Sequence, residues 1–294
     1  MGTRTGTTAL ASRSAIITGA SQGLGREIAR RFVGEGASVL IVARSAGALL
    51  ETENELRSLV LTEDQQILSH AGDVSNPETC QEIAERAMAA FGGLTILVNN
   101  AGVLGELGRI EDVAWEDWAR VIAVNVFGPA LLCQAVIPRM RSQGYGKIIN
   151  VSGGGATKPL EGMSAYAASK AALVRLTENL ALELCGAGVD VNAIAPGALN
   201  TRLLDEMLAA GPAKLGEEFY QGAIRQRETG GNSPEHAAAL SVFLASSASD
   251  GISGRLISAV WDDWASLPDR REELAAGDVY TLRRIVPQDR GLSW

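Results

Sequence analysis

Cysteine and histidine are scarce in this sequence, which has three cysteines and two histidines among its 294 residues. Cys80, Cys133 and Cys185 are odd in number and widely spaced, so the sequence predicts neither a disulfide framework nor a cysteine metal cluster. His70 and His236 have no cysteine or histidine at ligand spacing. We therefore predict no metal site and a reducing compartment, which is typical of the cytoplasm.

Long apolar runs and basic clusters are also missing. Lysine and arginine total 26 against 34 aspartates and glutamates, a net charge of −8, and no stretch is basic enough to neutralise a phosphate backbone. No apolar run approaches the roughly 20 residues that cross a bilayer, and the N-terminus lacks the apolar centre of a signal peptide. These absences argue against nucleic-acid and membrane partners and favour a cytoplasmic location.

Short apolar runs alternate with longer stretches of helical period, which is the pattern of strand–helix units around a parallel sheet. The predicted strands lie near residues 14–18, 38–42, 66–71, 95–99, 146–151, 189–195 and 255–259. The predicted helices cover residues 24–35, 46–61, 77–91, 115–142, 165–186 and 234–245. We predict an α/β fold with a doubly wound, seven-stranded parallel sheet and helices on both faces.

This alternation covers residues 12–260, which we predict to form a single domain after an N-terminal extension at 1–11. Residues 201–232 contain several glycines and are predicted to form a substrate lid. Four cations near the lid either hold an anionic substrate group or are solvated surface charges: Lys158, Arg202, Arg225 and Arg227. Residues 261–294 are irregular and are predicted to be an extension packed on the domain or on a neighbouring subunit.

The first predicted strand runs directly into a glycine-rich turn, Thr18-Gly19-Ala20-Ser21-Gln22-Gly23-Leu24-Gly25, before the first helix. Glycines let the backbone approach a pyrophosphate, whose charge is met by N–H groups at the helix N-terminus. A plain strand-to-helix turn also uses glycine, so the position on the first strand is what favours a nucleotide site. The candidate residues are Gly19, Ser21, Gln22, Gly23, Leu24 and Gly25.

Further motifs follow in order: Asp73-Val74, Asn99-Asn100-Ala101-Gly102, Asn125, Tyr166-x-x-x-Lys170, and Pro196-Gly197 followed by Leu199 and Thr201. With the glycine turn, they make residues 12–260 resemble the short-chain dehydrogenase/reductase superfamily, in its compact single-domain subdivision. The resemblance implies a Rossmann-type fold, an NADP or NAD cofactor, a small-molecule carbonyl or alcohol substrate, and a homodimer or homotetramer.

The resemblance also implies which residues hold the cofactor. They are Asp73 and Val74 at the adenine, Asn100, Ala101 and Gly102 at the ribose, and Pro196, Gly197, Leu199 and Thr201 at the nicotinamide. Arg44 follows the second predicted strand, where an acidic residue would bind the ribose of NAD. Because a guanidinium pairs with the additional phosphate of NADP, Arg44 favours NADP; a solvated loop arginine is the alternative.

Tyr166 and Lys170 are four residues apart on a predicted helix, so their side chains share one face. A nearby ammonium stabilises a phenolate, so Lys170 is expected to lower the pKa of Tyr166 and make it an effective acid and base. By resemblance, Lys170 also holds the nicotinamide ribose. Asn125 resembles an asparagine that organises a water leading protons to the lysine; bonding to backbone within a kinked helix is the alternative.

The family's catalytic serine is displaced here. Counting back thirteen positions from Tyr166 gives Gly153, whereas the nearest hydroxyl is Ser152 at the start of a run of three glycines. A shifted loop would let Ser152 act as the catalytic serine. Thr157, Ser164 or backbone N–H groups of the glycine run are the alternatives.

These residues predict an oxidoreductase that interconverts a carbonyl and a secondary alcohol by hydride transfer, with Tyr166 as general acid and base. Two other functions stay open. One is a non-catalytic NADP-binding sensor or scaffold, and the other is an epimerase or dehydratase that uses the cofactor transiently.

Overall fold

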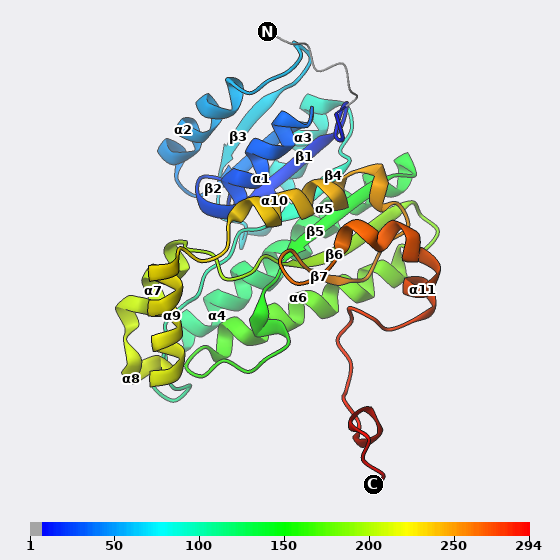
Figure 1. The fold of residues 1–294 in the computed structure, drawn as a ribbon. Coiled ribbons are helices and arrows are strands. Elements are labelled where there is room, and N and C mark those ends of the chain that lie inside the picture. Colours follow the sequence, from blue (N-terminus) through cyan, green and yellow to red (C-terminus); the bar gives the residue numbers. More distant parts are fainter. Residues whose placement is uncertain (1–7) are drawn as a thin grey trace.

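A single parallel sheet organises the computed structural model, which describes residues 8–294 (Figure 1). Its seven strands lie in the order β3-β2-β1-β4-β5-β6-β7, and every neighbouring pair is parallel. They are β1 (Ser14–Thr18), β2 (Ser38–Ala43), β3 (Ile67–Ala71), β4 (Ile96–Asn99), β5 (Gly146–Val151), β6 (Val189–Ala195) and β7 (Leu256–Ser258). The predicted sheet is confirmed; residues 1–7 of the predicted N-terminal extension lie outside the described residues.

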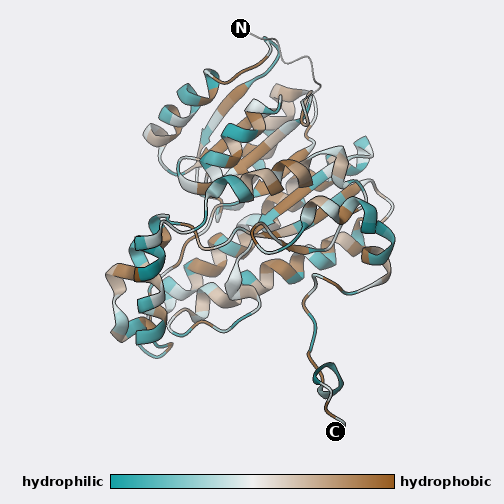
Figure 2. Ribbon diagram, viewed as in Figure 1, coloured by the Kyte–Doolittle hydropathy of each residue, from teal (hydrophilic) through white to brown (hydrophobic). Residues whose placement is uncertain are grey.

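Helices cover both faces of the sheet. One face packs against α1 (Gly23–Gly34), α2 (Ala46–Arg57) and α10 (Pro234–Ala245). The other packs against α3 (Pro77–Phe91), α5 (Gly128–Gln143) and α6 (Ser164–Glu183). The central strands β1, β4 and β5 are buried throughout, and Figure 2 shows the apolar colouring of the sheet. Because β1 is flanked by β2 and β4, the chain reverses direction across the sheet there, and ligands of such folds bind at the carboxyl ends of the strands at this point.

The predicted helix at 115–142 is a continuous helix with a π-helical interruption. It consists of α4 (Trp115–Ile122), the π-helix η1 (Ala123–Phe127) and α5. By length and composition alone, Trp115–Gln143 could cross a membrane, so the expectation that no stretch approaches that length was wrong. In the fold, Val124, Leu132 and Val136 of this helix are buried in the core against the sheet, as in the core helix of a globular domain.

The predicted lid folds into three short helices, α7 (Arg202–Ala210), α8 (Pro212–Leu215) and α9 (Glu217–Thr229). They stand apart from the sheet, beside α4 (Figure 1). Short 3-10 turns complete the chain: η2 (Gly154–Ala156), η3 (Ser247–Ser249), η4 (Trp264–Arg270) and η5 (Pro287–Arg290), with α11 (Arg271–Ala276) after η4.

The C-terminal extension lies against the domain as far as Leu282. The guanidinium of Arg255, which is buried, donates hydrogen bonds to the carbonyl oxygens of Leu274, Gly277 and Val279. At the sheet edge, the backbone N–H of Leu256 in β7 donates to an extension carbonyl, that of Tyr280, at 2.8 Å. Beyond Leu282 the chain projects away from the domain (Figure 1).

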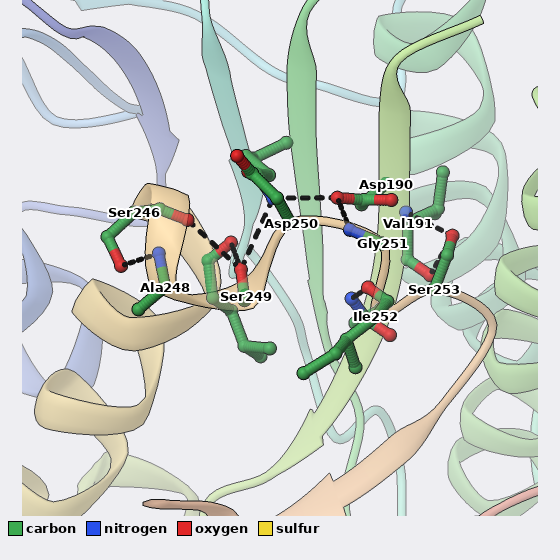
Figure 3. Close-up of polar contacts among 12 residues, drawn as sticks. Asp190, Val191, Ser246, Ala248, Ser249, Asp250, Gly251, Ile252 and Ser253 are labelled. Atoms are coloured by element: carbon green, nitrogen blue, oxygen red, sulfur yellow. Dashed lines mark hydrogen bonds and ion pairs between the residues drawn. The ribbon is translucent and has the colours of Figure 1, made fainter. Parts of the chain in front are cut away.

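A buried lysine fastens the segment before β7 to the amino ends of β5 and β6. Lys147 is 1% exposed, and its ammonium lies 2.7 Å from carboxylate oxygens of both Asp190 and Asp250. It also donates to the hydroxyl of Ser249, and Asp190 accepts the backbone N–H of Gly251 (Figure 3). These groups lie at the amino ends of the strands, opposite the cavity-forming carboxyl ends.

Replacing this lysine is expected to destabilise the fold. Lys147→Met keeps the apolar stem but leaves the carboxylate of Asp190 without its partner, which is expected to cost about 3 kcal/mol in the free energy of unfolding measured by urea titration. The exposed pair of Lys214 and Glu106, at 3.7 Å, provides the control, since Lys214→Met should cost less than about 0.5 kcal/mol. Equal costs for both variants would contradict this role of Lys147.

Candidate active site

A cavity of about 790 Å³ opens at the carboxyl ends of the strands, where the direction of the chain reverses. Every sequence-predicted site residue lines it except Asn125. The lining includes Gly19, Ser21, Gln22, Gly23, Leu24, Gly25, Arg44, Asp73, Val74, Asn100, Ala101, Gly102, Ser152, Tyr166, Lys170, Pro196, Gly197, Leu199 and Thr201. The fold therefore gathers these residues, which come from separate loops, around one space.

The glycine turn lines one part of the cavity. Its glycines are required because larger side chains would not fit there. A Cβ atom on Gly25 would lie 2.4 Å from the side chain of Asn100, and one on Gly19 would lie 2.9 Å from the backbone of Ala101. Gly19 also has a φ of 65°, which favours glycine. Helix α1 begins at Gly23 with no side-chain cap and no acidic residue in its first turn. Its N-terminus is thus suited to an anion, and the turn fits the pyrophosphate of a dinucleotide.

Asn100 and Thr18 brace this turn against β4. The amide of Asn100 donates to the carbonyl oxygens of Thr18, at 2.8 Å, and Gly19, at 3.2 Å. The hydroxyl of Thr18 in turn accepts the backbone N–H groups of Asn100 and Ala101, both at 3.0 Å. Asn100, which the resemblance places at the ribose, therefore also positions the glycine turn. Thr18 begins the glycine-rich motif in the sequence, but it was not predicted as a site residue.

Arg44 and Asp73 line the cavity beyond the carboxyl ends of β2 and β3. Arg44 directly follows β2 and is exposed, and it forms no ion pair within residues 8–294. Burial alone would raise the pKa of Asp73, but hydrogen bonds from Ser75 and the guanidinium of Arg120 outweigh burial and lower it. The carboxylate of Asp73 is therefore already bound by Ser75 and Arg120, whereas the charge of Arg44 is available to a ligand.

Tyr166 and Lys170 lie one turn apart on α6, as predicted, with the ammonium of Lys170 5.6 Å from the ring centroid of Tyr166. The ammonium donates to the carbonyl oxygen of Val151 at the end of β5, at 2.9 Å. Burial lowers the pKa of Lys170 to about 8 and raises the pKa of Tyr166 to about 12. The expected lowering of the tyrosine pKa is therefore not seen, because desolvation of the phenolate outweighs the ammonium at this separation.

Asn125 lies in the π-helix η1 and braces three segments. Its amide donates to the carbonyl oxygen of Val103, at 2.9 Å, and to the hydroxyl of Ser169, at 3.0 Å. Its oxygen accepts the backbone N–H of Val103 at 2.9 Å. A Cβ atom on Gly102 would lie 3.4 Å from that oxygen and 3.6 Å from the ammonium of Lys170. Asn125 thus lies close behind the cavity wall, and its role in proton delivery stays a prediction.

The structure does not show the loop shift that would bring Ser152 to the site. Ser152 is 3% exposed, and its hydroxyl donates to the backbone carbonyl of Lys170 at 3.2 Å. Gly153 instead faces the centre, since a Cβ atom on it would lie 3.7 Å from the hydroxyl oxygen of Tyr166. This follows from the alternation of side chains at the end of β5. Within the described residues, no side-chain hydroxyl forms a hydrogen bond with that of Tyr166, including those of Thr157 and Ser164.

Beside Tyr166 the wall is apolar. Leu104, Leu107, Met163 and Leu215 are buried in one cluster, against which Tyr166 and the lid residues Leu203 and Met207 pack. Leu203 and Met207 also line the cavity, and sequence analysis missed them. Their spacing of four residues, which places them on one face of α7, was the available signal.

Comparisons with known proteins identify the family of this chain. Residues 13–210 match the family model described as short chain dehydrogenase. The human "Dehydrogenase/reductase SDR family member 4" is 34% identical over 251 residues, which cover 84% of this chain and 86% of that protein. Levodione reductase from Leifsonia aquatica is 32% identical over 247 residues, covering 83% and 91% of the two chains.

Solved structures share the fold of this chain. The crystal structure of NAD⁺-bound xylitol dehydrogenase superposes with a TM-score of 0.77 at 26% identity, covering 85% of this chain and 98% of that one. The crystal structure of levodione reductase gives a TM-score of 0.76 at 29% identity, covering 85% and 96%. From the family match, the relatives and the shared fold, we conclude that the chain is an oxidoreductase of the short-chain dehydrogenase/reductase superfamily.

Proposed function

We propose that this chain interconverts an uncharged ketone and its secondary alcohol with NADP(H), and that Tyr166 is the general acid and base. The observation that carries the proposal is the placement of Tyr166 and Lys170 in the wall of the cavity that the glycine turn closes at its other end. One space thus joins a dinucleotide cradle to a phenol and an ammonium, which is the combination that carbonyl reduction needs.

In the direction of reduction, a dinucleotide held at the glycine turn would supply the hydride that the carbonyl carbon accepts. Tyr166, which burial keeps protonated, donates a hydrogen bond to the carbonyl oxygen and then its proton as that oxygen becomes an alkoxide. The ammonium of Lys170 stabilises the phenolate that remains. Oxidation of the alcohol runs through the same groups in reverse, with Tyr166 accepting the proton.

Tyr166→Phe tests this role directly. The variant keeps the ring and its packing but has no proton to donate, so kcat with NADPH and a ketone should fall by about a hundredfold or more. The Kd for NADPH, measured by quenching of protein fluorescence, should stay within about threefold of the wild type, because the hydroxyl is not required by the glycine turn. Retained turnover in Tyr166→Phe would contradict the proposal.

The two other candidate functions are separated by the same assay. The missing serine hydroxyl near Tyr166 favours the sensor as the second candidate. A sensor would bind NADPH tightly and turn over no ketone in a broad panel, whereas an epimerase or dehydratase would change its substrate without net consumption of NADPH.

The preference for NADP rests on Arg44. Its exposed guanidinium lines the adenosine end of the cavity, where the additional phosphate of NADP requires a positive charge. An acidic residue, which would repel that phosphate, is absent from the end of β2, where Ala43 stands.

Arg44→Ala is expected to weaken NADPH binding by about ten- to a hundredfold and to change NADH binding less than about threefold, as a charge-assisted hydrogen bond is worth roughly 1.5–3 kcal/mol. Arg270→Ala in the C-terminal extension removes the same charge away from the cavity and serves as the control. Equal losses for NADPH and NADH in Arg44→Ala would count against NADP preference.

We further propose a homodimer or homotetramer that is formed through the helices around α4 and α6. Trp115, Phe127 and Leu182 are large apolar side chains that are 69%, 55% and 78% exposed on α4, η1 and α6. Their burial between copies would remove this apolar surface from water.

Charged residues at these positions should prevent assembly. Phe127→Glu combined with Leu182→Glu is expected to give monomers in sedimentation velocity, while the wild type sediments as a dimer or tetramer. The matched control is Leu50→Glu with Leu61→Glu, two leucines that are 57% and 53% exposed in and after α2. If the control dissociates equally, or the wild type is already monomeric, this interface is wrong.

A further inference from the structure

Gly153 is a glycine that neither the backbone nor the packing requires. Its φ of 161° is extended backbone that any residue adopts. A Cβ atom built on it would meet one heavy atom within 4 Å, the hydroxyl oxygen of Tyr166 at 3.7 Å, which is an ordinary contact. By contrast, a Cβ atom on the nearby Gly155 would lie 3.0 Å from Leu160. The effect of glycine at 153 is therefore free space beside the phenol.

Tyr166, whose hydroxyl borders this space, belongs to an apolar cluster with Leu203 and Met207 of the lid, and these two side chains line the cavity with it. A ligand group that fills the space exchanges water for these side chains, which favours hydrocarbon over polar substituents.

Of the four cations named near the lid, Arg202 is the one that lines the cavity; Lys158, Arg225 and Arg227 do not line it. Arg202 and Arg227 are already paired. The guanidinium of Arg202 lies 3.1 Å from the carboxylate of Glu206, and that of Arg227 is paired with Asp205. A substrate carboxylate or phosphate would therefore enter an apolar space and compete with lid carboxylates for these partners. Of the two interpretations of the lid cations, the structure favours surface charges over an anion site.

We propose that Gly153 determines substrate size, and that the substrate is an uncharged ketone, or its alcohol, with a branched or cyclic hydrocarbon group on the carbonyl carbon. This inference rests on the proposed carbonyl chemistry at Tyr166. The hydrocarbon group occupies the space that a side chain at position 153 would fill. Gly153 is thus a specificity residue.

The test compares Gly153→Ala with the wild type on small and bulky ketones. The wild type should have a kcat/KM for cyclohexyl methyl ketone and acetophenone that exceeds its value for propanone and butanone by about tenfold or more. Gly153→Ala should lower kcat/KM for the bulky pair by about tenfold or more and change it for the small pair by less than about threefold. An unchanged ratio of bulky to small would overturn the proposal.

Two further variants separate space from hydrogen bonding. Gly153→Ser adds a hydroxyl as well as volume, so it should lose activity on the bulky ketones to the same extent as Gly153→Ala, within about threefold. Gly154→Ala, where a Cβ atom would meet nothing within 4 Å, should leave the ratio of bulky to small within about threefold of the wild type. An effect of Gly154→Ala equal to that of Gly153→Ala would refute the assignment to position 153.

The charge of the substrate is tested with a matched pair of ketones. Para-methylacetophenone should be turned over with a kcat/KM at least about tenfold higher than para-acetylbenzoate, because the carboxylate loses hydration without gaining a free partner. A preference for para-acetylbenzoate would overturn the claim that the substrate is uncharged.

Binding distinguishes a failure of this inference from a failure of the proposed function. Cyclohexanecarboxamide, an unreactive neutral analogue, should bind the NADPH complex of the wild type at least about tenfold more tightly than that of Gly153→Ala in isothermal titration calorimetry. If the analogue binds with this difference but no ketone is turned over, the role of Gly153 in ligand size is supported and the proposed carbonyl chemistry is wrong. Ketone turnover without any effect of Gly153→Ala would defeat the inference alone.

Discussion

The carboxyl ends of β1 and β4 meet so closely that no side chain fits between them, and the site depends on this contact. A Cβ atom on Gly25 would lie 2.4 Å from the amide of Asn100, and that amide holds the carbonyl oxygens of Thr18 and Gly19. The contact sets the turn, the turn sets the start of α1, and α1 presents its N-terminal N–H groups to the cavity. The glycine spacing, the turn and the position of the helix N-terminus therefore depend on one packing constraint.

At the other end of the cavity, burial decides the chemistry. Removing water raises the pKa of Tyr166 to about 12 and lowers the pKa of Lys170 to about 8, so the phenol holds its proton more firmly than in water while the ammonium releases its own more easily. Near neutral pH the phenol is therefore protonated, which is the form that donates a proton to the substrate oxygen in reduction. The lysine supplies the opposing effect, since its charge favours the phenolate once the proton has moved.

The fold was predictable because the signals that specify it are local. Apolar strand runs, helical periods and glycine turns follow one another along the chain, and the structure reproduces their order. The predicted helix to residue 61 ends at Arg57, however, because the side chain of Gln65 binds the backbone N–H groups of Leu61 and Thr62 and organises a turn there. A hydrogen bond between a side chain and the backbone several residues away does not change the hydrophobic periodicity of a sequence, so it could not be predicted.

The site was predictable as a set of positions and less so as an arrangement. Counting residues identified Gly153 as the position that faces Tyr166, but only coordinates show that Ser152 turns toward the carbonyl of Lys170. Likewise, the spacing of four residues in the sequence allows Arg202 to pair with Glu206 within α7, but the pairing of Arg227 with Asp205 depends on how α9 packs on α7. The pKa values depend on desolvation, which is a property of the whole fold and not of a motif.

The central claim is that a hydride reaches a carbonyl carbon in the same cavity that contains Tyr166. Its most direct test is to incubate the purified protein with deuterated NADPH and acetophenone and to analyse the product by mass spectrometry. Our account predicts a secondary alcohol that carries one deuterium on its carbinol carbon. Tight binding of the cofactor with no labelled alcohol, for this ketone and for the aliphatic ones, would contradict it.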